Sequence, residues 1–130
     1  MEILELHHVS LPTRDLERSR TFYRDVLGLE VAADEPGICA EFATAGARLA
    51  LVGEATMGAV VGRPAPRAGD AVVVCLKVDD VDAMAAKAKS RGAALVREPH
   101  DQPTWLQRVA HLRDPAGNLV ELWTRLAPPR

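Results

Sequence analysis

The segment VSLPTRDLE at residues 9–17 and the segment VCLKVDDVD at residues 74–82 follow the same pattern of apolar, small and acidic positions. A second pair agrees with the first, because ARLALV at 47–52 matches GNLVEL at 117–122. The chain therefore contains the same unit twice, with offsets of 65 and 70 residues between matching segments. Solenoid arrays have shorter periods and more copies, so two copies predict a closed pseudo-twofold pair of modules.

The first unit is predicted to fold as a strand, a helix and three further strands. Apolar and β-branched residues at 3–11 predict the opening strand. In the helix that follows, Asp15 is the expected N-cap, and Gly28 is the expected left-handed residue after the last turn. Short apolar segments predict the remaining strands near residues 29–33, 38–43 and 47–52.

The second unit repeats this order of elements. Residues 71–78 predict a strongly apolar strand, and the next helix is expected to begin after Asp79 or Asp80 and to end before Gly92. Three more strands are expected near residues 93–97, 106–113 and 118–124. The sequence DPAGN at 114–118 is typical of a tight turn, so the last two strands should form a hairpin.

These elements predict one α+β domain over residues 1–130, with module one at 3–52 and module two at 71–124. Residues 53–70 are rich in glycine and lack periodicity, so they are expected to be a linker. Each module has the order βαβββ. Two such modules predict paired curved sheets around a central cavity, which is where ligands usually bind.

Composition excludes several classes of protein. A net charge of −2 and scattered arginines provide no basic face for nucleic acid or an anionic membrane. No apolar run reaches the length of about 18 residues that a membrane span needs, and the N-terminus lacks the pattern of a signal peptide. Cys39 and Cys75 lie in apolar runs and are expected to be buried free thiols. We therefore expect a cytoplasmic protein.

Three segments carry a family resemblance that covers residues 3–124. These are HHVSLPTRDLERSRTFYRDVLGLE at 7–30, AVVVCLKVDDVDAM at 71–84 and RDPAGNLVELW at 113–123. Together they resemble the vicinal-oxygen-chelate superfamily, which includes glyoxalase I, extradiol dioxygenases, methylmalonyl-CoA epimerase and proteins of fosfomycin or bleomycin resistance. The resemblance implies the glyoxalase/bleomycin-resistance/dioxygenase fold, but one fold can host several activities.

The resemblance also implies metal-ligand positions on the first and last strand of each module. The matching positions here are His8, Ala50, Val73 and Glu121, of which only His8 and Glu121 keep a ligand type. Catalytic zinc takes about three protein ligands, and non-haem iron about two histidines and a carboxylate. Two ligands would hold a divalent ion weakly, so no cofactor is expected, and His111 is a remote third ligand.

The remaining histidines are not expected to contribute. His7 neighbours His8, so strand alternation should point it to the opposite face. His100 lies in EPHDQP, which has the composition of a loop. For His8 and Glu121 we favour a hydrogen-bonded pair without metal, because a buried carboxylate needs a partner. The alternatives are a working metal site, or His8 as a metal-free general base oriented by Glu121.

Strand alternation predicts an apolar cavity lining with one polar pair. The residues expected to bind a ligand are His8, Ser10, Val73, Cys75, Trp105, Glu121 and Trp123. Trp105 lies in a loop, where it either stacks on a planar ligand at the cavity mouth or covers the edge of the core. Such a lining suits a bulky hydrophobic ligand better than a small phosphonate.

The resulting hypothesis is a small-molecule-binding protein of the drug-resistance kind. It would act as a homodimer and sequester a hydrophobic or aromatic metabolite or drug without metal. One alternative is a divalent-metal-dependent lyase, isomerase or dioxygenase of the same superfamily that uses His8 and Glu121. The other is a structural or regulatory dimer with no ligand.

Overall fold

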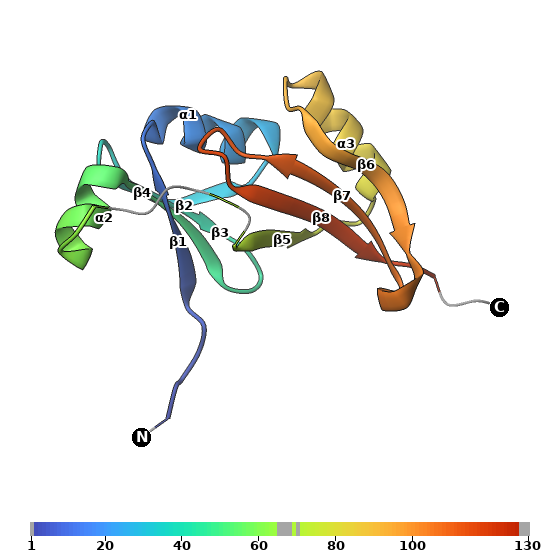
Figure 1. Cartoon of the computed structure of the whole chain (residues 1–130), viewed down its shortest axis with the longest axis horizontal. Helices are drawn as coiled ribbons and strands as arrows, with labels where there is room; N and C mark the ends of the chain where they lie inside the picture. Colours follow the sequence, from blue (N-terminus) through green and yellow to red (C-terminus); the bar gives the residue numbers. More distant parts are fainter. Residues whose placement is uncertain (1, 65–68, 70, 128–130) are drawn as a thin grey trace. The chain divides into compact units, whose positions relative to one another are not determined.

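A computed structural model describes residues 2–64, 69 and 71–127 of the chain (Figure 1). The chain divides into two compact units, Met1–Ala68 and Gly69–Arg130. Each unit contains one four-stranded mixed sheet with helices, which confirms the predicted α+β fold built from two βαβββ modules. The cavity expected between the modules depends on their relative placement and stays a prediction.

The first unit contains the elements β1 (His8–Thr13), α1 (Leu16–Thr21), the π-helical turn η1 (Phe22–Val26), β2 (Glu30–Glu35), β3 (Cys39–Ala43), β4 (Arg48–Gly53) and α2 (Glu54–Val61). Its sheet has the order β1-β4-β3-β2. β1 runs parallel to β4, whereas β4 with β3 and β3 with β2 are antiparallel.

The second unit contains β5 (Val73–Lys77), α3 (Val81–Ser90), β6 (Leu95–Gln102), the 3₁₀ turn η2 (Pro103–Trp105), β7 (Gln107–Arg113) and β8 (Leu119–Arg125). Its sheet has the equivalent order β5-β8-β7-β6. The register repeats as well, because Ser10 pairs with Ala50 in the first sheet and Cys75 pairs with Glu121 in the second. Ala50 and Glu121 therefore hold equivalent positions in the two sheets, as the sequence repeat predicted.

The predicted ends of the two main helices are confirmed. Asp15 and Asp80 each accept a hydrogen bond of 3.0 Å from the backbone N–H three residues further on, which satisfies one donor of the first helical turn. Gly28 and Gly92 follow the helices with φ of 79° and 95°. In this left-handed region a side chain would be strained, and glycine is not.

The π-helical turn η1 places two consecutive aromatic residues in the core of the first unit. The N–H of Leu27 bonds to the carbonyl of Phe22, five residues earlier, at 3.1 Å, so this turn is wider than an α-helical one. Phe22 and Tyr23 are 7% and 0% exposed, and the Tyr23 ring lies 5.8 Å from that of Phe42 on β3. The helix is thereby packed against the middle of its sheet.

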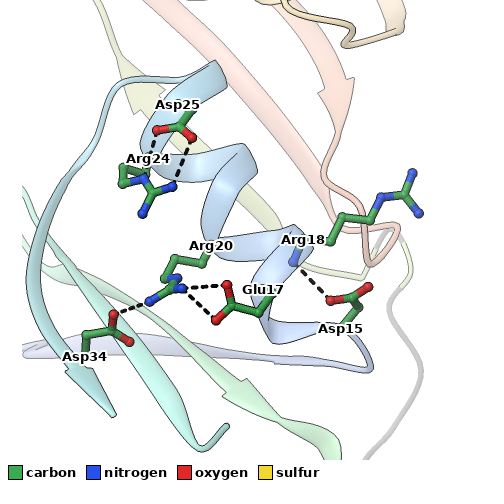
Figure 2. Close-up of polar contacts among 7 residues, drawn as sticks. All are labelled: Asp15, Glu17, Arg18, Arg20, Arg24, Asp25 and Asp34. Carbon is green, nitrogen blue, oxygen red and sulfur yellow. Dashed lines mark hydrogen bonds and ion pairs between the residues drawn. The ribbon is translucent and has the colours of Figure 1, made fainter. Parts of the chain in front are cut away.

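Ion pairs on the outside of α1 connect the helix to the edge strand β2 (Figure 2). Arg20 Nη2 donates to the two carboxylate oxygens of Glu17 at 2.6 and 2.5 Å, while Nη1 pairs with Asp34 on β2. One turn further on, Arg24 Nε donates to Asp25 at 2.8 Å. Because the Arg20 side chain is only 17% exposed, its pairing with two carboxylates anchors the strand beneath the helix.

The core of the second unit lies between α3 and one face of its sheet. On the helix, the buried residues are Val81, Ala85 and Ala88. On the sheet, the fully buried residues of that face are Ala110, Leu112, Val120 and Leu122. The buried residues of α3 are thus spaced three or four apart, which places them on one side of the helix.

Two strand predictions were wrong at their ends. The first strand begins at His8, because residues 3–6 do not pair with a neighbour, and Ile3 and Leu4 are 94% and 92% exposed. The sixth strand is longer than predicted and includes His100, which we had assigned to a loop. Composition misled here, since Pro99 is tolerated on an edge strand, where register shifts interrupt the ladder.

Two local expectations also differ from the structure. The region expected to be a linker contains α2, which ends at Gly62 with φ of 82°. Cys39 is half-buried and Cys75 exposed, so the expectation of buried thiols was wrong, although both are free. Cys39 is the first residue of β3, and Cys75 lies on the edge strand β5. Among the described helices, none is long and apolar enough to cross a membrane.

Removing a core side chain should destabilise the protein far more than removing an exposed one of the same type. Leu122 is 1% exposed, so we expect Leu122→Ala to lower the free energy of unfolding by about 2–5 kcal/mol through lost burial and a residual cavity. Leu4→Ala is the matched control, because Leu4 is 92% exposed, and should change it by less than about 0.5 kcal/mol. Urea denaturation measures both, and equal losses would contradict the assigned core.

Candidate functional site

The sheet of the second unit has one face turned toward α3 and one turned away from it. Arg108 on β7 identifies the helix side, because its Nε and Nη2 donate to Asp82 of α3 at 2.6 and 2.8 Å. Strand alternation places the neighbouring positions on the opposite side. We call this opposite side the outer face. On β5, β7 and β8 its residues are Val73, Cys75, Lys77, Gln107, Val109, His111, Arg113, Leu119, Glu121, Trp123 and Arg125.

A row of polar side chains crosses the outer face. Cys75 on β5 pairs in register with Glu121 on β8, Glu121 pairs with His111 on β7, and His111 pairs with Arg97 on the edge strand β6. Each residue thus comes from a different strand. Register alone brings these four together, since paired residues of neighbouring strands share a face of the sheet.

His111 and Glu121 form the closest contact of the row. His111 Nε2 donates to Glu121 Oε1 at 3.0 Å, and the two side chains are 21% and 15% exposed. A carboxylate that is this far removed from water needs a donor, and losing it would cost about 1–3 kcal/mol. His111 supplies that donor from within the same sheet.

Cys75 lies on the other side of Glu121 in the row. Although Cys75 as a whole residue is exposed, partial loss of water around the thiol raises its pKa to about 11, and the neighbouring Glu121 carboxylate contributes. Both effects disfavour the thiolate, so Cys75 is protonated at neutral pH and donates rather than accepts. The thiol itself donates to the carbonyl of Val73 at 3.8 Å, so His111 is the donor that the Glu121 carboxylate has in this row.

Apolar and aromatic side chains lie beside this polar row. Val73 pairs with Leu119, one register step away, and is 39% exposed. On the other side of the row, Trp123 pairs with Val109, and Lys77 Nζ lies 5.4 Å from the centre of the Trp123 ring. The outer face thus combines a paired carboxylate with exposed apolar surface.

His100 occupies the edge of the same region. Its Nδ1 donates to the carbonyl of Glu98 at 2.8 Å, and its Nε2 accepts from Gln102 Nε2 at 2.9 Å. These two contacts are compatible with the neutral imidazole. Its ring centre lies 6.3 Å from that of His111, so two imidazoles stand next to each other on β6 and β7.

The equivalent row of the first unit has different chemistry. Ser10 pairs with Ala50, and Ala50 with Glu41, so Glu41 takes the place that His111 has in the second unit. Ala50 is 4% exposed and carries no donor or acceptor on its side chain. His8 pairs with Arg48 at the start of the parallel ladder.

His7 was expected to point away from His8, and this was wrong. The two Nδ1 atoms lie 2.8 Å apart, and the rings meet edge to face with centres 5.1 Å apart. Because β1 begins at His8, His7 is outside the strand and its side chain does not follow strand alternation.

The structure brings four of the predicted site residues to one sheet face, namely Val73, Cys75, Glu121 and Trp123. His8 and Ser10 belong to β1 of the first unit, so a joint site of His8 with Glu121 stays a prediction. Trp105 lies in η2 and is 67% exposed, which places it outside the buried core.

Sequence reasoning underrated His111, although a signal for its position was present. In a hairpin closed by the turn at 114–118, Arg113 pairs with Leu119, and two positions further on His111 pairs with Glu121. Counting outward from the predicted turn would therefore have identified the partner of Glu121. Arg97 offered no such signal, because bulges separate it from both ends of its strand.

A catalytic metal ion needs about three protein ligands. Among the residues that the structure describes, no group of three His, Cys, Asp or Glu side chains could hold a metal ion. Within the second unit, Glu121 is bonded to His111, and Cys75 favours the thiol form. The described residues of this unit do not by themselves fit a three-ligand site.

Two βαβββ units of equivalent topology and register define a protein of the vicinal-oxygen-chelate class. The chain belongs to the Glyoxalase/Bleomycin resistance protein/Dioxygenase superfamily, whose sequence model matches residues 5–122. The predicted superfamily is thereby confirmed.

Individual relatives agree with this assignment. The chain is 31% identical to the uncharacterized protein YraH of Bacillus subtilis (strain 168), over 95% of this chain and 100% of that protein. It is 26% identical to a glyoxalase/bleomycin resistance protein/dioxygenase from Nocardioides, with a TM-score of 0.80 over 100% of this chain and 89% of the other. A lactoylglutathione lyase from Agrobacterium tumefaciens is also 26% identical, with a TM-score of 0.75 over 94% of both chains.

The environment of Cys75 can be tested by alkylation in a Cys39→Ser background, which leaves one thiol. Its pKa of about 11, against an ordinary value of 9.0, should make iodoacetamide labelling at pH 8.5 about a hundredfold slower than for an unperturbed thiol. The rate should rise with pH up to about 11. Glu121→Gln removes the repelling charge, lowers the pKa and should accelerate labelling. Equal rates in both proteins would contradict the assigned contact.

Proposed function

We propose that this protein binds a hydrophobic or aromatic small molecule, a metabolite or drug, on the outer face of the β5-β8-β7-β6 sheet, and that it does so without a resident metal ion. Binding would sequester the molecule, in the manner of a drug-resistance protein. We further propose that it acts as a homodimer in the cytoplasm.

The observation that carries this proposal is the pairing of Glu121 with His111 at 3.0 Å. Glu121 is the one retained ligand position of the second module, and its carboxylate already has a hydrogen-bond donor from the same sheet. At the equivalent position of the first module, Ala50 offers no ligand atom. Neither position needs a metal ion to satisfy it, which favours a binding function over a metal-dependent one.

The apolar part of the outer face supports a hydrophobic ligand. Val73 is 39% exposed on the edge strand β5, next to Leu119 and close to the Cys75 thiol. Trp123 adds a flat ring on β8, over which Lys77 already lies. Exposed apolar surface next to a few polar groups is the usual composition of a small-molecule site.

A neutral fluorescent probe tests the proposal. We expect N-phenyl-1-naphthylamine to bind to the metal-free protein with increased fluorescence, because its rings leave water for the apolar outer face. Val73→Asp should weaken this binding by at least about tenfold, since it places a charge where the apolar rings would lie. Fluorescence titration measures both dissociation constants.

Val60→Asp on α2 is the matched control, because Val60 is also an exposed valine, at 78% exposure, but belongs to the first unit. It should leave the dissociation constant unchanged. No binding to the unsubstituted protein, or equal weakening by both substitutions, would contradict the proposal.

The second candidate is a divalent-metal-dependent lyase, isomerase or dioxygenase that uses His8 and Glu121. The likeness to a lactoylglutathione lyase, 26% identical over 94% of both chains, is the observation in its favour. Such an enzyme would need a further ligand, and His111 is the candidate for it.

Metal analysis separates the two candidates. For protein purified without chelators we expect clearly less than one transition-metal ion per chain by mass spectrometry. We also expect the same change in melting temperature on adding Mn²⁺, Ni²⁺ or Zn²⁺ to the natural sequence and to His8→Ala. One bound ion per chain that disappears in Glu121→Ala would instead establish the metal-dependent enzyme.

A further inference from the structure

Among the described charged side chains of the second unit, some have an ion-pair or hydrogen-bond partner, and others have none. Glu121 is bonded to His111, Glu98 to Lys89 at 2.5 Å, and Asp101 to Arg108 at 2.8 Å. Lys89 belongs to α3 and Arg108 faces it, so Glu98 and Asp101 pair on the helix side of the sheet, and Glu121 is the carboxylate of the outer-face row. What remains unpaired there is positive, which favours an anionic ligand over a cationic one.

Arg97 is the cation in question. It is exposed on the edge strand β6 and pairs in register with His111. Among the described residues it has no ion-pair partner and no side-chain hydrogen bond, in contrast to Arg108 on the neighbouring strand, which binds two carboxylates. The β-bulges on either side of Arg97 interrupt the ladder, a feature that often directs a side chain toward a site.

We infer that the molecule bound on the outer face is an apolar carboxylate, whose anionic group binds the guanidinium of Arg97 while its apolar body lies over β8 and β7. This inference rests on the proposed function and specifies its ligand class. A guanidinium can bind a carboxylate with two parallel hydrogen bonds, which makes it better suited than a point charge to select this group. Lys77 is the weaker candidate, because it lies over the Trp123 ring.

The sheet also sets the length of the ligand. β8, which carries Trp123 and Glu121, is separated from β6 by β7 alone. Two strand spacings amount to about 10 Å, which the arginine side chain and the ligand have to bridge together. A ring on β8 and a carboxylate at Arg97 therefore require a spacer of several bonds between them. A ligand whose carboxylate adjoins its ring would be too short to reach both.

Competition against bound N-phenyl-1-naphthylamine tests this inference, with 4-phenylbutyrate as the anionic probe and 4-phenylbutanamide as its neutral match. In the natural sequence the carboxylate should compete about tenfold better than the amide, because of the charge-assisted pair with Arg97. Added salt should reduce this preference, since an exposed charge pair is screened. Benzoate, which lacks the spacer, should compete more weakly than 4-phenylbutyrate.

Arg97→Ala should abolish the preference for the carboxylate over the amide while the neutral naphthylamine still binds. Arg97→Lys, which keeps the charge but not the planar donor group, should retain part of it. Arg91→Ala is the matched control, because Arg91 is also an exposed arginine of the second unit but lies at the end of α3, on the other side of the sheet. It should retain the full preference.

The outcomes separate this inference from the proposed function. If the neutral probe binds but carboxylate and amide compete equally, or if Arg97→Ala keeps the preference, the inference is overturned and the binding function stands. If the neutral probe does not bind at all, both are overturned. A lost preference in Arg97→Ala with a retained one in Arg91→Ala supports the inference.

Discussion

The turn at residues 114–118 fixes the register on which the candidate site depends. Asp114 Oδ1 accepts hydrogen bonds from the N–H groups of Ala116 and Asn118 at 3.0 and 2.8 Å, and its Oδ2 accepts from Asn118 Nδ2 at 2.8 Å. Gly117 provides the positive φ, 93°, that closes the turn. With this geometry His111 must lie opposite Glu121, because a slip of one residue would turn every side chain of the strand to the other face.

The same scaffold carries different chemistry in its two copies. At equivalent register positions the first sheet has Ser10, Ala50 and Glu41, whereas the second has Cys75, Glu121 and His111. The topology, the capped helix and the parallel pairing of first and last strand are common to both, so these features belong to the fold. The row of side chains is what differs, and function has to be argued from it.

The fold could be predicted because its signals are local and repeated. Asp15 and Asp80 mark the helix starts, and the turn at 114–118 marks a hairpin. Alternation then assigned Val73, Cys75, Glu121 and Trp123 to a single face, where the structure has them. The partner of Glu121 was missed because it depends on pairing with a neighbouring strand, and His100 because a proline on an edge strand resembles a loop.

The hydrogen bond between Glu121 and His111 changes which charge a ligand of the outer face has to carry. A half-buried carboxylate without a donor would demand a cation from whatever binds beside it, whether a metal ion or an amine. Glu121 has His111 at 3.0 Å and the Cys75 thiol on its other side, so it makes no such demand. The charge preference of the outer face then depends on groups that are not yet paired. Of those in the polar row, Arg97 is the cation left to interact with a ligand, since the described structure gives it no ion pair.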